Sequence, residues 1–188
     1  MAVEAGADAL GFVFFQGSPR FISPEEAAMI IRRLPPFVQT VGLFVNEAST
    51  KVNAIADQCG LDLIQLHGDE LPAFCHPWPV KVIKAIRVRD AHSLRAAAEY
   101  DVDALLLDTY TAEQRGGTGQ AFDWALARQA KMLVRPPLIL SGGLTPENVG
   151  DAIRQVAPFA VDVASGVEAE PGRKDPEKLR RFFEAVSA

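Results

Sequence analysis

Leu138-Ile139-Leu140-Ser141-Gly142-Gly143-Leu144 is an apolar run that ends in small residues, and Thr145-Pro146-Glu147 follows it as a helix start. The next apolar run closes on Asp162-Val163-Ala164-Ser165-Gly166. A strand, a short turn and a helix in succession make a βα unit. Backbone N–H groups approach a phosphate closely only where side chains are small. The two turns therefore predict a phosphate site, although glycines can also do no more than end strands. The candidate phosphate-binding residues are Gly142, Gly143, Ser165 and Gly166.

Five further apolar runs precede these two, at residues 9–14, 40–45, 61–66, 80–86 and 104–107. The runs are continuous rather than alternating, as in parallel strands that are covered on both faces. Their starts lie about 20 to 35 residues apart, the spacing of repeated βα units. We therefore predict a TIM (β/α)8 barrel, with residues 1–188 as a single phosphate-binding domain. A doubly wound open sheet is the alternative, and the lack of a GxGxxG turn disfavours its dinucleotide-binding form.

Helix boundaries are marked by capping residues. Ser23, Thr145 and Asp175 each precede a proline and a glutamate, which predicts three helix starts. Asp69, Asp90 and Asp123 are candidate caps for three more helices, and Gly60 is placed to end one. Apolar residues at helical spacing follow the first three caps. They are Ile30, Ile31 and Leu34, then Val149, Ile153 and Val156, then Leu179, Phe182, Phe183 and Val186.

The first residues of the chain are typical of the end of a helix. Residues 1–7 fit one or two helical turns that Gly6 terminates, directly before the first apolar run. So short a helix is not stable alone, because nucleation is costly and few hydrogen bonds follow. We therefore expect that the first strand of the barrel and the start of its first helix are missing from this chain. Seven strands without the eighth would leave two unpaired edges.

Composition excludes several classes of protein. The net charge is −5 and no basic cluster offsets it, which argues against a nucleic-acid partner. Cys59 and Cys75 have neither zinc-site nor disulfide-framework spacing, so we expect no metal and a reducing, cytoplasmic location. No apolar stretch is long enough for a membrane span and no signal peptide is visible. An acidic protein must hold an anionic substrate by local devices. We expect a monomer or a homodimer.

Three polar residues lie where catalytic groups of a β/α barrel gather, at strand ends and in the loops that follow. Asp108 ends an apolar strand, where desolvation suits a general acid, although it could instead cap a loop. His67 ends another strand and is either structural or in contact with substrate. Arg20 follows the first run, and its guanidinium suits a carboxylate or phosphate, unless it is merely solvated. The glycine-rich loop 109–122 could close over a ligand and is not a P-loop.

These segments together resemble phosphoribosylanthranilate isomerase, in the order and spacing of that family and nearly from end to end. The segments are Gly11-Phe12-Val13-Phe14, Ser18-Pro19-Arg20, Gly42-Leu43-Phe44-Val45-Asn46, Gln65-Leu66-His67-Gly68, Leu106-Leu107-Asp108, Gly116-Gly117-Thr118-Gly119, Phe122-Asp123-Trp124, Ser141-Gly142-Gly143-Leu144 and Asp162-Val163-Ala164-Ser165-Gly166-Val167-Glu168.

The resemblance implies an enzyme of tryptophan biosynthesis that needs no cofactor. Its reaction would be the Amadori rearrangement of N-(5-phosphoribosyl)anthranilate to the 1-deoxyribulose derivative. Asp108 would be the general acid that protonates the ribose ring oxygen, and Arg20 would hold the anthranilate carboxylate. The two glycine turns would bind the phosphate, and His67 and Asp162 would lie close to the substrate.

The sequence departs from the family at the general base. The family carries a cysteine in a Lys-Ile-Cys-Gly-Ile-Thr segment on its first strand, and this sequence has no such segment. Cys59 lies at a predicted helix end and Cys75 between strands, so we expect neither to replace it. Gln120 also stands where many members have lysine, and Ala164 where serine is common.

Two other functions remain open. A histidine-pathway sugar-phosphate isomerase performs the same type of reaction, but it consists of two similar barrel halves, and this chain shows no internal repeat. The Gln-Leu-His-Gly and Phe-Asp-Trp segments also disfavour a version that accepts both substrates. A non-catalytic phosphate-binding remnant would retain Asp108 and both glycine turns.

We predict little or no isomerase activity for the polypeptide of residues 1–188. Loss of a general base removes a contribution of about 10²–10⁴-fold to the rate. Turnover should be measured for this polypeptide and for one extended by a Lys-Ile-Cys-Gly-Ile-Thr strand. Equal and robust rates for the two would show that the base lies elsewhere.

Overall fold

The computed structural model describes residues 1–109 and 124–188. These residues divide into two compact units, residues 1–84 and residues 85–188. The predicted cap Asp123, residues 110–122 of the glycine-rich loop and Gln120 within it lie outside the described residues.

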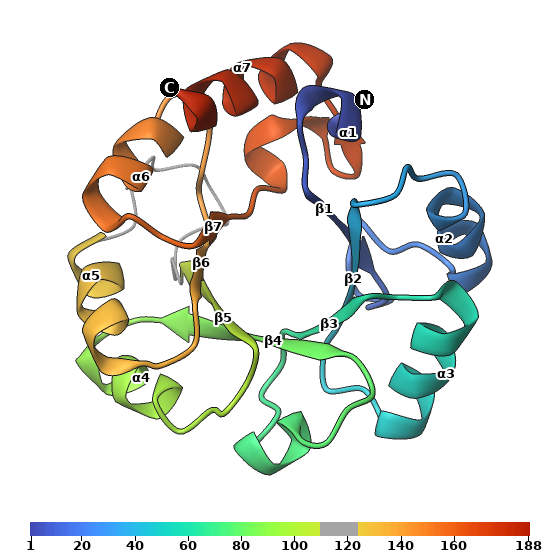
Figure 1. Cartoon of the computed structure of the whole chain (residues 1–188), viewed down its shortest axis with the longest axis horizontal. Helices are drawn as coiled ribbons and strands as arrows, with labels where there is room; N and C mark the ends of the chain where they lie inside the picture. Colours follow the sequence, from blue (N-terminus) through green and yellow to red (C-terminus); the bar gives the residue numbers. More distant parts are fainter. Residues whose placement is uncertain (110–123) are drawn as a thin grey trace. The chain divides into compact units, whose positions relative to one another are not determined.

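The first unit is a parallel βα arrangement. Its elements are α1 (Ala2–Ala5), β1 (Ala9–Val13), α2 (Pro24–Ile31), β2 (Gln39–Phe44), α3 (Ser49–Cys59), β3 (Leu63–Leu66), the 3-10 turn η1 (Pro72–Cys75) and the first half of β4 (Lys81–Val88). Strand β2 pairs in parallel with β1 and β3, and β3 pairs in parallel with β4. In Figure 1, α2 and α3 lie side by side along one side of β1 to β3. The rings of Phe14 and Phe44 stack with centroids 5.4 Å apart.

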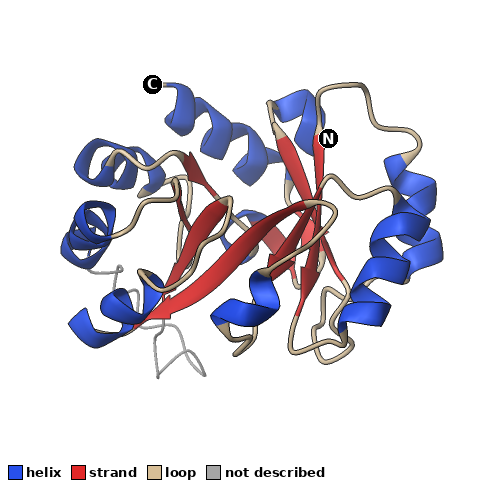
Figure 2. Ribbon diagram, turned by 60° about the horizontal axis from the view of Figure 1, so that its bottom comes forward, coloured by secondary structure: helices blue, strands red, loops and turns tan. Residues whose placement is uncertain are grey.

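The second unit repeats the pattern. After the second half of β4 come α4 (Ala91–Ala97), β5 (Ala104–Thr109), α5 (Trp124–Leu133), β6 (Leu138–Leu140), α6 (Val149–Val156), β7 (Ala160–Val161), the 3-10 turn η2 (Ser165–Val167), β8 (Glu168–Glu170), β9 (Arg173–Lys174) and α7 (Pro176–Ser187). Strand β6 pairs in parallel with β5 and β7, whereas β8 and β9 form a small antiparallel pair. Figure 2 shows strands and helices as separate layers. Between them lies a core that includes Leu105, Leu107, Leu138 and Leu140.

Each of the seven predicted strands is present, and they follow chain order, β1 to β7, in one sheet. The prediction of repeated parallel βα units is therefore confirmed. Within the described residues the sheet has seven strands, and the expectation that a first strand of an eight-stranded barrel is missing is not supported. That residues 1–188 form a single domain stays a prediction.

Most of the predicted helix boundaries are confirmed. Ser23 caps α2 in a capping box with Glu26, and Asp90 and Asp175 each accept hydrogen bonds from the first backbone N–H groups of α4 and α7. Gly60 ends α3 in the left-handed conformation, at φ 67°. Gly6 ends α1 in the same way. The apolar residues predicted for α6 and α7 contribute to the core of the second unit.

Two predicted caps and one predicted core position are wrong. Residues 146–148 form a turn before α6, so the helix begins at Val149 and not directly after Thr145, although Glu147 N–H donates to Thr145 Oγ1 at 3.3 Å. Asp69 starts no helix, since its N–H donates to the side chain of Asn46. Ile30 is 44% exposed, and the buried residues of α2 are alanines.

None of the helices within the described residues is both long enough and apolar enough to span a membrane.

Candidate active site

Asp108, Ser141 and Asp162 form a row across the ends of three neighbouring strands. Leu107 of β5 pairs with Leu140 of β6, and Leu140 pairs with Val161 of β7. The next residue along each strand is a member of the row. Ser141 N–H donates to Leu107 O at 2.9 Å, and Asp162 N–H donates to Leu140 O at 2.9 Å. The parallel register therefore places Asp108 and Asp162 on either side of Ser141.

The row lies on the face of the sheet away from the helices. Leu105 and Leu107 belong to the core that packs against the helices, whereas Leu106 is buried but is not part of that core. Side chains alternate between the faces of a strand, so Asp108 shares the face of Leu106. The same alternation applies to β6, where Leu138 and Leu140 belong to the helix-side core. Ser141 therefore projects to the same face as Asp108.

Ser141 connects one of the two carboxylates to the sheet. Its hydroxyl group donates to Asp162 Oδ2 at 2.8 Å. Ser141 is 9% exposed, Asp108 is half-buried and Asp162 is exposed. The row thus offers one carboxyl group in a partly desolvated position and one carboxylate that is oriented by a buried hydroxyl. Sequence reasoning proposed both aspartates but not Ser141, although its place between a strand and two glycines marks a strand end.

The two predicted glycine turns are in contact with each other. Gly142 and Gly143 follow β6 with φ of 81° and 68°, a conformation that favours glycine. A Cβ atom added to Gly166 would lie 1.8 Å from the carbonyl oxygen of Leu144, directly after them. The backbone of the turn after β7 therefore lies against the turn after β6, and that the two turns form one phosphate site stays a prediction. Ser165, at the start of η2, is exposed.

Two lysines that sequence reasoning did not single out fasten the second turn. Lys174 Nζ donates to Ala164 O at 3.0 Å and lies 3.3 Å from Glu168 Oε1. Lys178 Nζ donates to Glu168 O at 2.8 Å. These contacts join the turn after β7 to β9 and to the first turn of α7.

The loop after β1 folds back, so that Arg20 lies near the end of this strand. Within the loop, Ser18 N–H donates to Phe15 O and Phe21 N–H donates to Ser18 O, which makes two successive turns. Val13 and Phe21 then form an isolated parallel bridge. The backbone N–H of Arg20 donates to Ser18 Oγ at 3.1 Å, and the residue is half-buried. Arg20 therefore lies in the loop after β1, where the sequence placed it, and its role in binding stays a prediction.

His67 directly follows β3, with its backbone N–H donating to Phe44 O at 2.8 Å. The residue is half-buried. Gln65 Nε2 lies 2.8 Å from His67 Nδ1, and because an amide nitrogen can only donate, Nδ1 accepts. The imidazole then carries its proton on Nε2, which is a hydrogen-bond donor.

A buried ion pair lies beside His67, and sequence reasoning missed it. Lys84 Nζ and Glu70 Oε2 are 2.8 Å apart, with side chains only 2% and 3% exposed. A single lysine inside the apolar strand Val82-Ile83-Lys84-Ala85-Ile86 was a signal that could have found it, because a buried lysine needs a partner.

Neither cysteine is placed to act as a base. Cys59 Sγ donates to Pro24 O at 3.3 Å, and Cys75 Sγ donates to Leu71 O at 3.7 Å. Burial raises the pKa of both thiols, and the nearby Glu25 carboxylate raises the pKa of Cys59 further. Both thiols therefore stay protonated near neutral pH.

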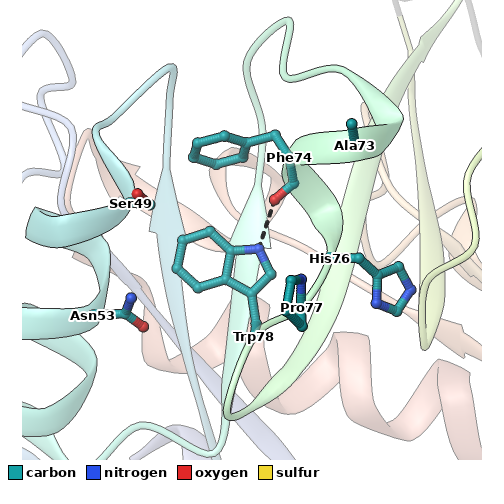
Figure 3. A pocket seen from close by; sticks show the side chains of 7 residues that line it. All are labelled: Ser49, Asn53, Ala73, Phe74, His76, Pro77 and Trp78. Carbon is teal, nitrogen blue, oxygen red and sulfur yellow. Dashed lines mark hydrogen bonds between the residues drawn. The ribbon is translucent and has the colours of Figure 1, made fainter.

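One pocket of about 300 Å³ lies between α3 and η1 with the segment that follows η1 (Figure 3). It is lined by Ser49, Asn53, Ala73, Phe74, His76, Pro77 and Trp78. The indole N–H of Trp78 donates to Phe74 O at 2.7 Å across this segment. None of the predicted site residues lines the pocket, so we assign it no part in the site. Across residues 1–109 and 124–188, no cluster of three or more His, Cys, Asp or Glu could hold a metal ion.

The sequence-predicted site residues thus fall into two groups. Arg20 and His67 lie at strand ends of the first unit, whereas Asp108, Asp162 and the glycine turns lie at strand ends of the second. That the two groups surround one cavity stays a prediction.

A family model described as N-(5'phosphoribosyl)anthranilate (PRA) isomerase matches residues 1–185. The N-(5'-phosphoribosyl)anthranilate isomerase of Citrifermentans bemidjiense is 62% identical over 183 residues, which are 97% of this chain and 88% of the relative. The relative from Geobacter sulfurreducens, with the same name, is 57% identical over 97% of this chain and 89% of its own length.

Solved structures of such isomerases share the fold. The phosphoribosyl anthranilate isomerase of Thermotoga maritima matches with a TM-score of 0.90 and 44% identity, over 99% of this chain and 91% of that protein. Another matches with a TM-score of 0.87 and 43% identity over 99% and 90%, and it was solved in complex with reduced 1-(o-carboxyphenylamino)-1-deoxyribulose 5-phosphate. A thiamine phosphate pyrophosphorylase from Pyrococcus furiosus, 16% identical with a TM-score of 0.67, shares the fold alone.

The contact between the glycine turns can be tested by adding one methyl group to each. We expect Gly166→Ala to lower the free energy of unfolding more than Gly143→Ala, because the new Cβ of Gly166→Ala overlaps the backbone of Leu144. Gly143→Ala meets no neighbour and should cost only about 1–2 kcal/mol for its left-handed conformation. Denaturant unfolding of both variants measures the difference, and equal stabilities would contradict the described contact.

Proposed function

Since the chain belongs to the N-(5'-phosphoribosyl)anthranilate isomerase family, we propose a role in substrate binding or chemistry for each of its site residues. The chain is an isomerase of tryptophan biosynthesis, with a parallel α/β fold of the TIM-barrel type. Its reaction is the Amadori rearrangement of N-(5'-phosphoribosyl)anthranilate from an aldose to a ketose form. Neither the histidine-pathway isomerase nor the non-catalytic remnant is favoured by the comparisons. The reduced activity of residues 1–188 remains a prediction.

Asp108 is the general acid in this proposal. Its carboxyl group donates a proton to the ribose ring oxygen, the bond from that oxygen to C1 breaks, and the anthranilate nitrogen supplies electrons to form a Schiff base. A base then removes the proton from C2 to give the enolamine, whose C2 hydroxyl group loses its proton as C1 gains one, which leaves the ketone at C2. Support comes from the half-buried place of Asp108 at the end of β5, on the face away from the helices.

Asp162 is proposed as a substrate-binding carboxylate that Ser141 orients. The buried Ser141 hydroxyl donates to Oδ2 of Asp162 and so orients an exposed carboxylate, whose oxygens can accept hydrogen bonds from hydroxyl groups of the sugar. The carboxyl group of Asp108 and the carboxylate of Asp162, on either side of one serine, can therefore contact different atoms of one ribose.

The phosphate group is proposed to bind at the two glycine turns. Gly142, Gly143, Ser165 and Gly166 place backbone N–H groups after β6 and β7, and the turns lie against each other. Glycine allows the close approach that phosphate oxygens require. Such a local device is necessary because the chain carries a net charge of −5, which repels the anionic substrate at long range.

Arg20 is proposed to bind the anthranilate carboxylate of the substrate, and His67 is proposed to donate to a substrate oxygen. A guanidinium group pairs with a carboxylate through two parallel hydrogen bonds, which suits Arg20 to the anthranilate carboxylate. The Nε2–H group of His67 is a donor for a substrate oxygen.

The observation that carries the whole proposal is the row of Asp108, Ser141 and Asp162 beside the paired turns. A cytoplasmic location, a monomeric or dimeric state and the lack of a cofactor, nucleic-acid or membrane partner remain predictions.

Asp108→Asn should separate chemistry from binding. An amide cannot donate the proton to the ring oxygen, so we expect Asp108→Asn to lower turnover by about 10²–10⁴-fold, with the substituted and unsubstituted proteins both compared in the polypeptide extended by the Lys-Ile-Cys-Gly-Ile-Thr strand. The affinity for reduced 1-(o-carboxyphenylamino)-1-deoxyribulose 5-phosphate should change little, as measured by calorimetry. Unchanged turnover would remove Asp108 from the role of general acid.

Arg20→Ala should weaken the affinity for the same reduced analogue about tenfold or more, because a charge-assisted hydrogen bond contributes about 1.5–3 kcal/mol. Arg33→Ala is the matched control, an exposed arginine just after α2 in the same unit. Calorimetric titration of both variants gives the comparison. Equal affinities for the two would show that Arg20 does not hold the carboxylate.

A further inference from the structure

The Lys84 ammonium group donates hydrogen bonds to the two backbone carbonyl groups on either side of His67. Its Nζ donates to Leu66 O at 3.1 Å and to Gly68 O at 2.8 Å. Its third contact is with Glu70 Oε2 at 2.8 Å. An ammonium group has three N–H donors, and each of these oxygens can accept from one of them.

Glu70 completes the arrangement from the other side. Its Oε1 accepts from the backbone N–H of Asn46 at 2.8 Å, and its Oε2 accepts from that of Gly68 at 2.9 Å. Asn46 follows β2, Gly68 follows β3, and Lys84 belongs to β4. One carboxylate and one ammonium therefore link the residues just beyond the ends of β2 and β3 to the interior of β4.

The loop between these contacts has little freedom. A Cβ atom added to Gly68 would lie 2.3 Å from Asn46 Oδ1. Asn46 itself has φ 50°, and its Oδ1 accepts from the N–H of Asp69 at 2.7 Å. The main chain of His67 is therefore fixed by the carbonyl groups of Leu66 and Gly68 on either side and by its own N–H on Phe44.

A contribution to stability alone does not account for this pair. Removing two charges from water costs free energy that their attraction often fails to recover, and well-packed apolar residues of similar size frequently stabilise as much. The rest of Val82-Ile83-Lys84-Ala85-Ile86 is apolar, so an apolar residue at position 84 would suit the strand. What an apolar residue would not supply is three directed hydrogen bonds around one loop.

We propose that Lys84 and Glu70 are positioning residues that set the place of the His67 imidazole at the substrate site. This inference rests on the proposed substrate contact of His67. The pair acts through the backbone of residues 66–70, and Gln65 then fixes the ring through Nδ1. Loss of the pair frees the loop and moves Nε2–H away from the substrate oxygen.

The test compares Lys84→Met, Lys84→Arg and the double variant Lys84→Met/Glu70→Gln. The double variant leaves no unpaired buried charge, so it is expected to fold even where Lys84→Met alone does not. Asp62→Asn is the matched control, because Asp62 also joins β2 to β3, through Thr40, but at the opposite ends of these strands. Each protein is assessed by thermal unfolding, by ¹⁵N NMR of the His67 ring, assigned with His67→Ala, and by its affinity for the reduced analogue.

We expect the double variant to shift the His67 Nδ1 resonance and to weaken analogue binding at least tenfold. Lys84→Arg should give an intermediate loss of affinity for the analogue, because a planar guanidinium group keeps the positive charge but cannot donate in the same three directions as the ammonium group. Asp62→Asn should lower the unfolding temperature and leave the ring resonance and the affinity unchanged. A folded double variant with a wild-type His67 spectrum would overturn the positioning role. If the unsubstituted chain fails to bind the analogue, the proposed function fails, and the NMR comparison still decides the role of the pair.

Discussion

Parallel register at the carboxyl ends of the strands is the constraint on which the candidate site depends. Two backbone hydrogen bonds, from Ser141 to Leu107 and from Asp162 to Leu140, fix which residues of β5, β6 and β7 lie next to each other across the sheet. A shift of one residue on any strand would turn its polar residue toward the helix layer. The apolar residues that alternate with the row prevent such a shift, because they must face the helices. The same burial that stabilises the second unit therefore also places Asp108 and Asp162.

In the first unit, a buried ion pair fixes the positions of residues just beyond the strand ends. The residues just beyond the ends of β2 and β3 are joined to each other and to the interior of β4 by the buried pair Lys84 and Glu70. The backbone hydrogen bonds between paired strands end where the strands end, so the loop residues beyond them are not held by these bonds. A buried ammonium and carboxylate supply directed contacts there, so the residues beyond the strand can be held as firmly as those within it.

The glycine turns combine both kinds of constraint. Gly142 and Gly143 adopt a backbone conformation that other residues avoid, and Gly166 leaves room for the backbone of Leu144. Lys174 and Lys178 then fasten the second turn to the end of the chain. A site for an anion can thus be built from main-chain groups in a protein whose overall charge is negative.

The sequence by itself determined the elements and many of the site residues. Continuous apolar runs located all seven strands, capping residues located α2, α4 and α7, and family motifs pointed to Asp108, Arg20 and the glycine turns, because these signals are local. It placed the start of α6 at Thr145, because the contact of Glu147 N–H with Thr145 Oγ1 resembles a helix cap, whereas a turn of residues 146–148 precedes the helix. Only the tertiary structure decided that Ser141 holds Asp162, that Gly166 lies on Leu144 and that Lys84 is paired with Glu70. Each of these contacts joins residues from different strands or loops, and such pairing depends on register and packing, which no single stretch of sequence contains.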